Sequence, residues 1–318
     1  MQIAQYFKLL KRTNRDDGWL SIVIGARGLH LVRVKRTADQ VAVVTNEFQP
    51  STSVTSADLE KCLNELHLEN ANCTTLLASD EYQMLVVDAP NVPPNELKTA
   101  VRFRIKDSLN FHVDDAYVDV MQIPANNGTA NRPQSLYAVA VSNDTLKKRI
   151  SLFEKAGANL EVIDIPETAQ RNIAELFETE GRGLALLAFD EKGGLLTFTS
   201  GGELYLARRL DITSGQLRDA NPEIRQQYVE RVELEVQRSM DYFDRQFHYI
   251  SLARLIVCAP AESGLIKLFA DALGLPVEAL DLSKVMNINA APALKDSDFV
   301  AEALSAIGAA LRQEGRGQ

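Results

Sequence analysis

Glycine residues mark two turns of the sequence, and an acidic residue accompanies the second; such turns could bind a phosphate group or a metal ion. Gly25 and Gly28 bracket the first turn, and Asp190 and Gly193 bracket the second. Glycine lets the backbone approach a phosphate closely, and a carboxylate at such a turn can hold a metal ion or a water molecule. These residues therefore suggest nucleotide binding as the first chemistry to consider.

Three further residues extend this candidate site. Asp164 and Glu167 follow one apolar run, and Gly264 follows another. A simpler interpretation is that the glycines only make turns, as isolated glycines often do. That alternative applies to Gly25, Gly28, Gly193, Gly194 and Gly264, and the sequence leaves it open.

Other reactive residue types are scattered. The four histidines have no ligand-like spacing, and the three cysteines are an odd number without a CxxC motif: His30, His67, His112, His248, Cys62, Cys73 and Cys258. The sequence therefore predicts no zinc site and no disulfide framework. It also contains no GxSxG, HExxH or Walker motif.

Composition narrows the function classes. The 318 residues are 46% hydrophobic and 24% charged, which predicts a large core divided between two lobes. The net charge of -9 opposes broad binding to nucleic acid. The longest apolar run, 184–189, is far shorter than the ~20 residues of a membrane-spanning helix. We expect a cytoplasmic protein whose membrane association is peripheral or comes through a partner.

Two parts of the sequence share one order of elements. Strands are predicted at 19–25, 29–35 and 41–48, then a helix at 56–68 and a strand at 74–78. The second half repeats this order with strands at 184–189, 194–199 and 203–210, a long helix striped from Val229 to Phe247, and a strand at 254–258. A repeated β-β-β-α-β unit is the layout of the ribonuclease H and actin class. We therefore expect an α/β protein with a duplicated ribonuclease H/actin-like ATPase fold, two lobes around a cleft.

An additional α+β segment lies between the two units, at about 83–157, as an insertion in the first lobe. It contains predicted strands at 83–88, 117–123 and 136–141 and helices at 95–109 and 144–156, with a polar loop at 124–133. We expect residues 1–182 to form the first lobe with this insertion, 183–298 the second lobe, and 299–318 a C-terminal helix that returns to the first lobe.

The N-terminus has an amphipathic pattern. In residues 1–12, Ile3, Phe7 and Leu10 share one helical stripe beside basic residues, as in short interfacial helices. A terminal helix that packs on the body or frays is the alternative.

Four segments together resemble the type IV pilus assembly protein family PilM and, within it, MshI of mannose-sensitive haemagglutinin (MSHA) pili. They are 87–120, with a proline turn and helix; 138–164, with a strand, helix and strand ending in aspartate; 233–247; and 268–281. Their order and spacing carry the resemblance, which covers nearly the whole chain and implies the actin-like fold.

The chain departs from the family at the nucleotide motifs. Val23 stands where the family has an aspartate, and His30 where it has a lysine. Asp164 is retained, but the following glutamate is displaced to Glu167 because a proline takes its place. Loss of these charges removes most of the stabilisation that phosphoryl transfer needs.

The second turn and the adenine side depart as well. Phe189 lies near the expected aspartate, so Asp190 is displaced, and Ala259-Pro260 replaces a glycine pair. The resemblance thus implies a degenerate cleft and a pseudo-ATPase, with no cofactor expected and ATP with magnesium as the alternative.

The resemblance also implies a function. PilM-like proteins dock the cytoplasmic tail of an inner-membrane partner, PilN or MshJ, and link it to the pilus assembly ATPase machinery. In the helix predicted at 95–109, an inward apolar stripe leaves Arg102, Phe103 and Lys106 for the peptide, unless they are only a solvated charged face. The alternatives are an ATP-dependent switch and a GspL-like component of type II secretion, although that family normally continues into a membrane-spanning helix.

Overall fold

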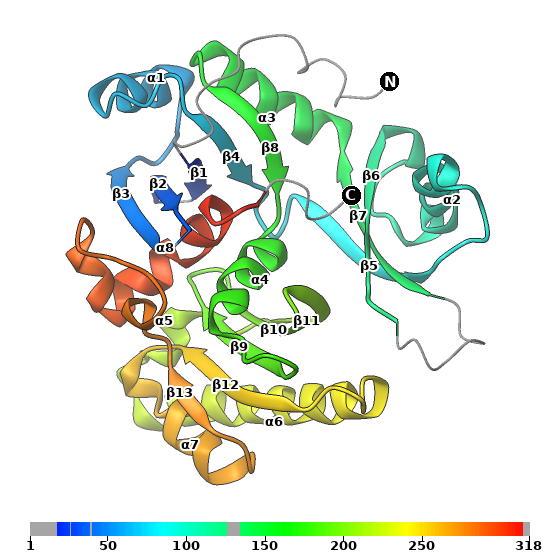
Figure 1. Ribbon diagram of the computed structural model, residues 1–318, viewed down its shortest axis with the longest axis vertical. Helices are drawn as coiled ribbons and strands as arrows, with labels where there is room; N and C mark the ends of the chain where they lie inside the picture. The colour runs from blue at the N-terminus through cyan, green and yellow to red at the C-terminus, as the bar shows by residue number, and fades with distance from the viewer. Residues whose placement is uncertain (1–17, 26, 39, 126–133, 314–318) are drawn as a thin grey trace.

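The computed structural model describes residues 18–25, 27–38, 40–125 and 134–313 (Figure 1). The interfacial helix predicted at 1–12 lies outside these residues, as does most of the loop predicted at 124–133. No helix among the described residues has the length and apolar character needed to cross a membrane.

The first lobe is built on a five-stranded sheet in the order β3-β2-β1-β4-β8. Strands β1, β2 and β3 form an antiparallel meander, whereas β4 runs parallel to β1 and to β8. Helix α1 follows the meander, and its N-terminus is closed by a capping box between Thr55 and Asp58. The bounds are β1 Trp19–Gly25, β2 Gly28–Arg36, β3 Val41–Pro50, α1 Ser56–Glu65, β4 Asn72–Leu76 and β8 Asn159–Asp164.

The second lobe repeats this topology, with the order β11-β10-β9-β12-β13. Its central strand β9 is buried along its whole length, which explains why its sequence is a continuous apolar run. The identical strand order confirms the predicted duplication. The bounds are β9 Gly183–Phe189, β10 Gly194–Ser200, β11 Glu203–Leu210, α5 Ser214–Leu217, α6 Pro222–Gln246, β12 Leu252–Cys258, α7 Leu265–Ala272 and β13 Val277–Ala279.

The insertion forms a third sheet, in the order β5-β7-β6, which lies to one side of the two lobes (Figure 1). Helix α2 covers one face of this sheet through Val101 and Ile105. The bounds are β5 Tyr82–Asp88, α2 Leu97–Arg104, β6 Ala116–Gln122 and β7 Ser135–Ser142, with short 3-10 helices at Pro94–Glu96, Lys106–Ser108 and Val113–Asp115.

Two predicted elements of the insertion differ in detail. Helix α2 is shorter than the predicted 95–109, because its apolar stripe ends at Ile105 and the chain continues as a 3-10 turn. Helix α3, Asn143–Lys155, is the last element within the predicted range of the insertion. Its Phe153, however, packs in the core of the first lobe. The insertion is therefore tied closely to the lobe that carries it.

Helices α4, Pro166–Phe177, and α8, Ser297–Ala310, lie at the centre of the molecule and join the lobes (Figure 1). They cross at Gly308, where an added Cβ would stand only 2.2 Å from the carbonyl oxygen of Ala169. Asn172 of α4 donates a hydrogen bond of 2.9 Å to the carbonyl of Gly308. The largest apolar cluster includes both helices and both five-stranded sheets, so one core spans the two lobes. Short 3-10 helices at Leu282–Lys284 and Pro292–Lys295 precede α8.

Candidate functional site

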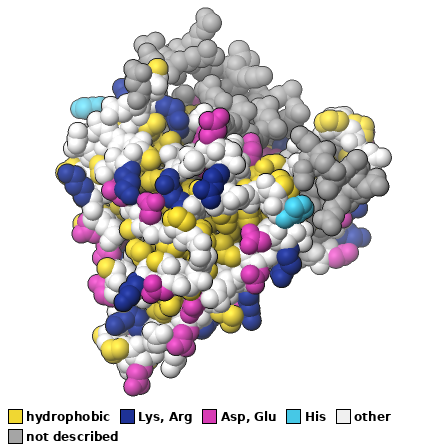
Figure 2. All heavy atoms as spheres, turned by 60° about the horizontal axis from the view of Figure 1, so that its bottom comes forward, with side chains coloured by type: hydrophobic (Ala, Val, Ile, Leu, Met, Phe, Trp, Pro, Cys, Tyr) yellow, Lys and Arg dark blue, Asp and Glu magenta, His cyan; other side chains and the backbone are white. Residues whose placement is uncertain are grey.

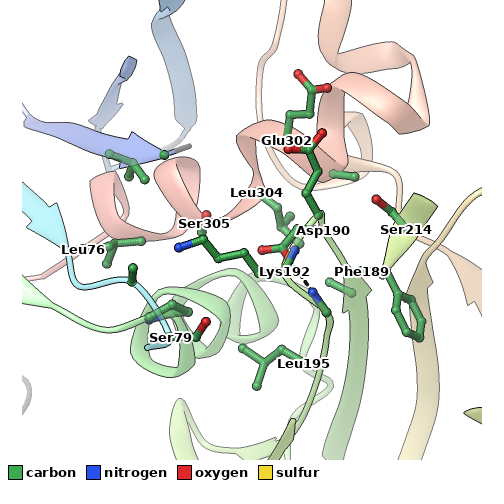
Figure 3. A pocket seen from close by; sticks show the side chains of 18 of the residues that line it. Leu76, Ser79, Phe189, Asp190, Lys192, Leu195, Ser214, Glu302, Leu304 and Ser305 are labelled. Carbon is green, nitrogen blue, oxygen red and sulfur yellow. Dashed lines mark hydrogen bonds between the residues drawn. The ribbon is translucent and has the colours of Figure 1, made fainter. Parts of the chain in front are cut away.

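A cleft of about 570 Å³ lies between the two lobes. The β1–β2 turn and the loop after β4 line it from the first lobe, the β9–β10 turn lines it from the second, and α4 and α8 contribute further residues. Figure 3 shows Leu76 and Ser79 on one side of this cleft and Asp190 and Lys192 on another. The duplicated fold therefore brings the two predicted glycine turns to one place.

Five of the predicted cleft residues line the cleft, namely Gly25, Gly28, His30, Asp190 and Gly193. The other three, Asp164, Glu167 and Gly264, are not among its lining residues. The absence of a cofactor from this cleft stays a prediction, with ATP and magnesium as the alternative.

Two of the glycines are required by the strand turns themselves. Gly28 has a φ of +151°, and a Cβ there would lie 2.1 Å from the carbonyl oxygen of Gln49 on β3. Gly193 has a φ of +147°, and a Cβ there would lie 2.6 Å from the carbonyl oxygen of Leu210 on β11. Sheet geometry alone thus accounts for both residues.

The basic side chain of the first turn is engaged within the protein. Arg27 Nε lies 2.9 Å from Glu191 Oε2 on the second turn, and its Nη2 lies 2.6 Å from Glu302 Oε1 on α8. The hydrogen bond that Arg27 donates to Glu302 raises the pKa of Arg27 above its ordinary value, against a smaller opposing effect of burial. The two turns are therefore joined directly by a salt bridge.

The remaining basic residues of the cleft are paired as well. Each Lys or Arg among its described lining residues has a carboxylate partner, with Lys192 Nζ 3.6 Å from Asp80 Oδ1 and Arg218 Nη2 2.5 Å from Asp298 Oδ1. The four basic residues of the lining are Arg27, Lys192, Arg209 and Arg218. The carboxylates of the lining outnumber them and are Asp80, Asp190, Glu191, Asp211, Asp298 and Glu302. A phosphate group entering the cleft would have to displace an existing ion pair and face an excess of negative charge.

His30 does not supply a cation in place of the expected lysine. Its Nε2 lies 2.8 Å from Asn46 Oδ1, and its ring meets Phe48 edge to face at 5.8 Å between centroids. Burial lowers the pKa of His30 below its ordinary value, only partly offset by the hydrogen bond with Asn46. The imidazole is therefore neutral at pH 7.

Two acidic residues predicted for the degenerate cleft make contacts within the protein. Asp190 Oδ1 accepts hydrogen bonds from the backbone N–H groups of Lys192 and Gly193, at 2.7 and 3.0 Å, and so shapes its own turn. Asp164 Oδ2 lies 2.8 Å from Arg312 Nη1 at the end of α8, while its Oδ1 accepts from Thr168. Among the described residues, no three His, Cys, Asp or Glu side chains are grouped as metal ligands.

Glu167 is almost completely buried, with 1% of its surface exposed. It accepts hydrogen bonds from the Tyr82 hydroxyl on β5 and from Arg209 Nε on β11, the latter at 3.0 Å. Arg209 itself lines the cleft. Sequence reasoning missed Tyr82 and Arg209 because no local motif marks either residue.

The predicted partner surface lies on α2. Phe103 has 58% of its surface exposed, and Lys106 is exposed beside it. Arg102 instead donates a hydrogen bond of 2.8 Å from Nε to the carbonyl of Val113 and lies 3.5 Å from Asp114. The apolar stripe of Leu97, Val101 and Ile105 faces the sheet, as predicted. Arg102 thus has a structural role within the insertion, whereas Phe103 and Lys106 face outward.

Figure 2 shows the side chains on one face of the described part of the chain, including a short row of Lys and Arg side chains. Basic and acidic side chains are intermixed there, with hydrophobic side chains between them.

Two β-β-β-α-β units, each built on a sheet of the same strand order and facing a shared cleft, define the duplicated ribonuclease H-like, actin-like fold. Across 93% of this chain and 98% of the other, the structure is similar to the solved "PilM-PilN type IV pilus biogenesis complex", with a TM-score of 0.69 and 20% sequence identity.

Two further solved structures are more distant. The cytoplasmic domain of EpsL, an inner-membrane component of the type II secretion system of Vibrio cholerae, matches with a TM-score of 0.46 and 13% identity over 85% of this chain and 87% of that chain. A protein of unknown function with an actin-like ATPase fold from Bacteroides thetaiotaomicron matches with a TM-score of 0.48 and 11% identity, over 91% and 99%. The sequence matches no protein-family model and no curated protein.

Proposed function

We propose that this chain is an actin-like scaffold of a type IV pilus assembly machine, at the cytoplasmic face of the inner membrane. It docks the cytoplasmic tail of a PilN-like membrane protein and links it to the assembly ATPase machinery. Support comes from the similarity in fold to the PilM-PilN complex and from the four segments that resemble the PilM family. Within that family we propose an MshI-like protein of MSHA pili, with a MshJ-like partner.

The cleft in this proposal is a pseudo-ATPase cleft that does not hydrolyse ATP. The observation that carries this part is the salt bridge of Arg27 with Glu191, which occupies the space between the two turns. An ATPase needs cations and a metal free to neutralise the developing charge on the phosphates. Here the cations of the cleft are already neutralised by carboxylates of the same chain.

Calorimetry with ATP and magnesium tests this part. We expect no heat of binding up to millimolar nucleotide. Binding in the micromolar range would overturn the inert cleft and favour the alternative, a switch whose lobes respond to nucleotide.

The proposed dock is the outward surface of α2 and of the 3-10 turn that follows it, defined by Phe103 and Lys106. Aromatic rings are enriched at the centre of protein interfaces, whereas charged side chains such as that of Lys106 belong to the polar rim around it. Since Arg102 is engaged with Val113, we assign it to the support of this surface rather than to direct contact.

Co-purification with a synthetic tail peptide of PilN or MshJ tests the dock. We expect wild-type protein to retain the peptide and a Phe103→Ser/Lys106→Glu variant to lose retention at least about tenfold. A matched control is Phe299→Ser/Lys295→Glu, which alters an exposed Phe and Lys on another part of the chain. Equal retention by the two variants would remove α2 as the docking surface.

A further inference from the structure

The insertion of the first lobe also contacts the second lobe, along the edge strand β11. Tyr137 of β7 donates a hydrogen bond of 3.1 Å from its hydroxyl to the carbonyl of Tyr205 on β11. Ile123, Tyr137 and Leu204 are buried together at this seam, with Phe247 packed against them. The insertion thereby packs against one edge of the second sheet, and Tyr137 satisfies a backbone carbonyl of that edge strand.

A polar network fastens the seam at its cleft end. Tyr82 comes from β5 of the insertion, Glu167 from the first turn of α4, and Arg209 from β11 of the second lobe. Arg209 Nη2 lies 2.7 Å from Glu167 Oε1 and also contacts the Tyr82 hydroxyl, which in turn donates to Glu167 Oε2. The guanidinium lies 5.6 Å from the centroid of the Tyr82 ring. Three separate parts of the molecule therefore meet in three side chains.

Partial separation of the three side chains of this network is energetically unfavourable. A buried carboxylate is strongly unfavourable unless it stays paired and hydrogen-bonded. Moving β11 away would leave Glu167 with Tyr82 alone, and moving the insertion away would remove the Tyr82 hydroxyl. Burial, and then the charge of Glu167, raise the pKa of Tyr82, so its hydroxyl stays protonated and able to donate.

The network also reaches the cleft, because Arg209 is one of its lining residues. On α4, three residues after Glu167, Gln170 donates hydrogen bonds to the carbonyls of Leu186 and Leu195 in the second sheet, at 2.8 and 3.0 Å. A displacement of the insertion would therefore be transmitted to the wall of the cleft through Glu167 and Arg209.

We infer that the insertion is a brace, which holds the second lobe through the network of Tyr82, Glu167 and Arg209, so that the position of the insertion and the opening of the cleft are set together. By thermodynamic linkage, anything that moves the insertion changes the cleft, and the reverse also holds. The inference does not depend on what binds to the insertion or to the cleft.

The test measures the distance between the insertion and the second lobe with spin labels at Asp107→Cys and Lys267→Cys, both exposed positions. The native cysteines are buried, so labelling is selective. The wild-type network should give one narrow distance distribution. The variant Glu167→Gln/Arg209→Met removes both charges at once, which avoids leaving an unpaired buried ion, and should broaden the distribution.

A matched pair of tyrosine variants distinguishes the effect of losing a hydrogen bond of the network from the effect of a general change in packing. Tyr82→Phe deletes the hydroxyl of the network, whereas Tyr117→Phe deletes the hydroxyl of a half-buried tyrosine on β6, the other edge strand of the same sheet. We expect Tyr82→Phe to speed amide exchange of β11 by about tenfold and Tyr117→Phe to leave it unchanged. The exchange of β4 serves as the internal reference for folding. Equal behaviour of the two tyrosine variants, or an unbroadened distribution in the folded double variant, would overturn the brace.

Discussion

Arg27 of the first lobe and Glu191 of the second lobe face each other across the cleft, with Nε and Oε2 2.9 Å apart. Each residue belongs to a strand turn that the duplicated fold brings to this place, so the contact joins equivalent positions of the two units. Both side chains are about half exposed, at 47% and 54%. The contact therefore fills the space between the turns without being deeply buried.

Because this salt bridge is exposed, its loss should hardly affect stability. We expect Arg27→Ala to lower the free energy of unfolding by less than about 1 kcal/mol, and the difference to shrink in high salt. Urea unfolding at low and high ionic strength measures it. A loss of several kcal/mol would mean that the bridge, rather than the shared core, holds the lobes together.

The free energy of unfolding should depend much more strongly on the crossing of α4 and α8 than on this salt bridge. Gly308→Ala places a Cβ where the carbonyl of Ala169 stands, so the helices must separate, and we expect a loss of about 1–3 kcal/mol. Gly215→Ala is the matched control, since the nearest atom to its new Cβ is Thr213 Oγ1 at an ordinary 3.7 Å. Thermal unfolding compares the two variants. If they melt alike, the close crossing is not a constraint on the lobes.

Asp164 should behave as a structural residue. Asp164→Asn weakens the ion pair with Arg312 while keeping an acceptor for Thr168, and we expect a loss of about 1–2 kcal/mol with faster amide exchange at the end of α8. The control Asp144→Asn removes an exposed i,i+4 pair with Lys148 and should change nothing measurable. Unchanged stability with altered ligand binding in the cleft would instead return Asp164 to the candidate site.

The duplicated fold could be predicted because each strand carries its own signal. The run 184–189 is apolar throughout, and the structure buries all of it in β9. Helix α6 likewise buries its predicted stripe, including Val232 and Phe243. Such periodicity is local in sequence and directly reflects burial.

The cleft was only partly predictable, since its chemistry depends on distant pairs. Gly25 and Asp190 could be placed there because the fold repeats, but the partners of Arg27 lie on other elements and no motif links them. The environment of Glu167 also depends on residues that are distant in the sequence. Its displacement from the family position was visible in the sequence, whereas its burial against Tyr82 and Arg209 required the three-dimensional arrangement.

The buried cysteines should make the protein less stable in alkali. Burial raises the pKa of Cys73 and of Cys258 to about 12, while an unfolded cysteine ionises near pH ~8.5. A group with a raised folded-state pKa contributes stability that is complete below the unfolded pKa and is lost as pH rises through the folded pKa. We therefore expect the midpoint temperature of thermal unfolding to decrease as the pH is raised from about 8.5 to 12. The double variant Cys73→Ala/Cys258→Ala should show a smaller decrease over the same pH range. Its lower stability at pH 7 is the baseline for that comparison, because the removal of buried sulfur atoms leaves small cavities. If the midpoint temperature decreased equally with pH in the variant and the wild-type protein, groups other than these two cysteines would govern the loss of stability in alkali.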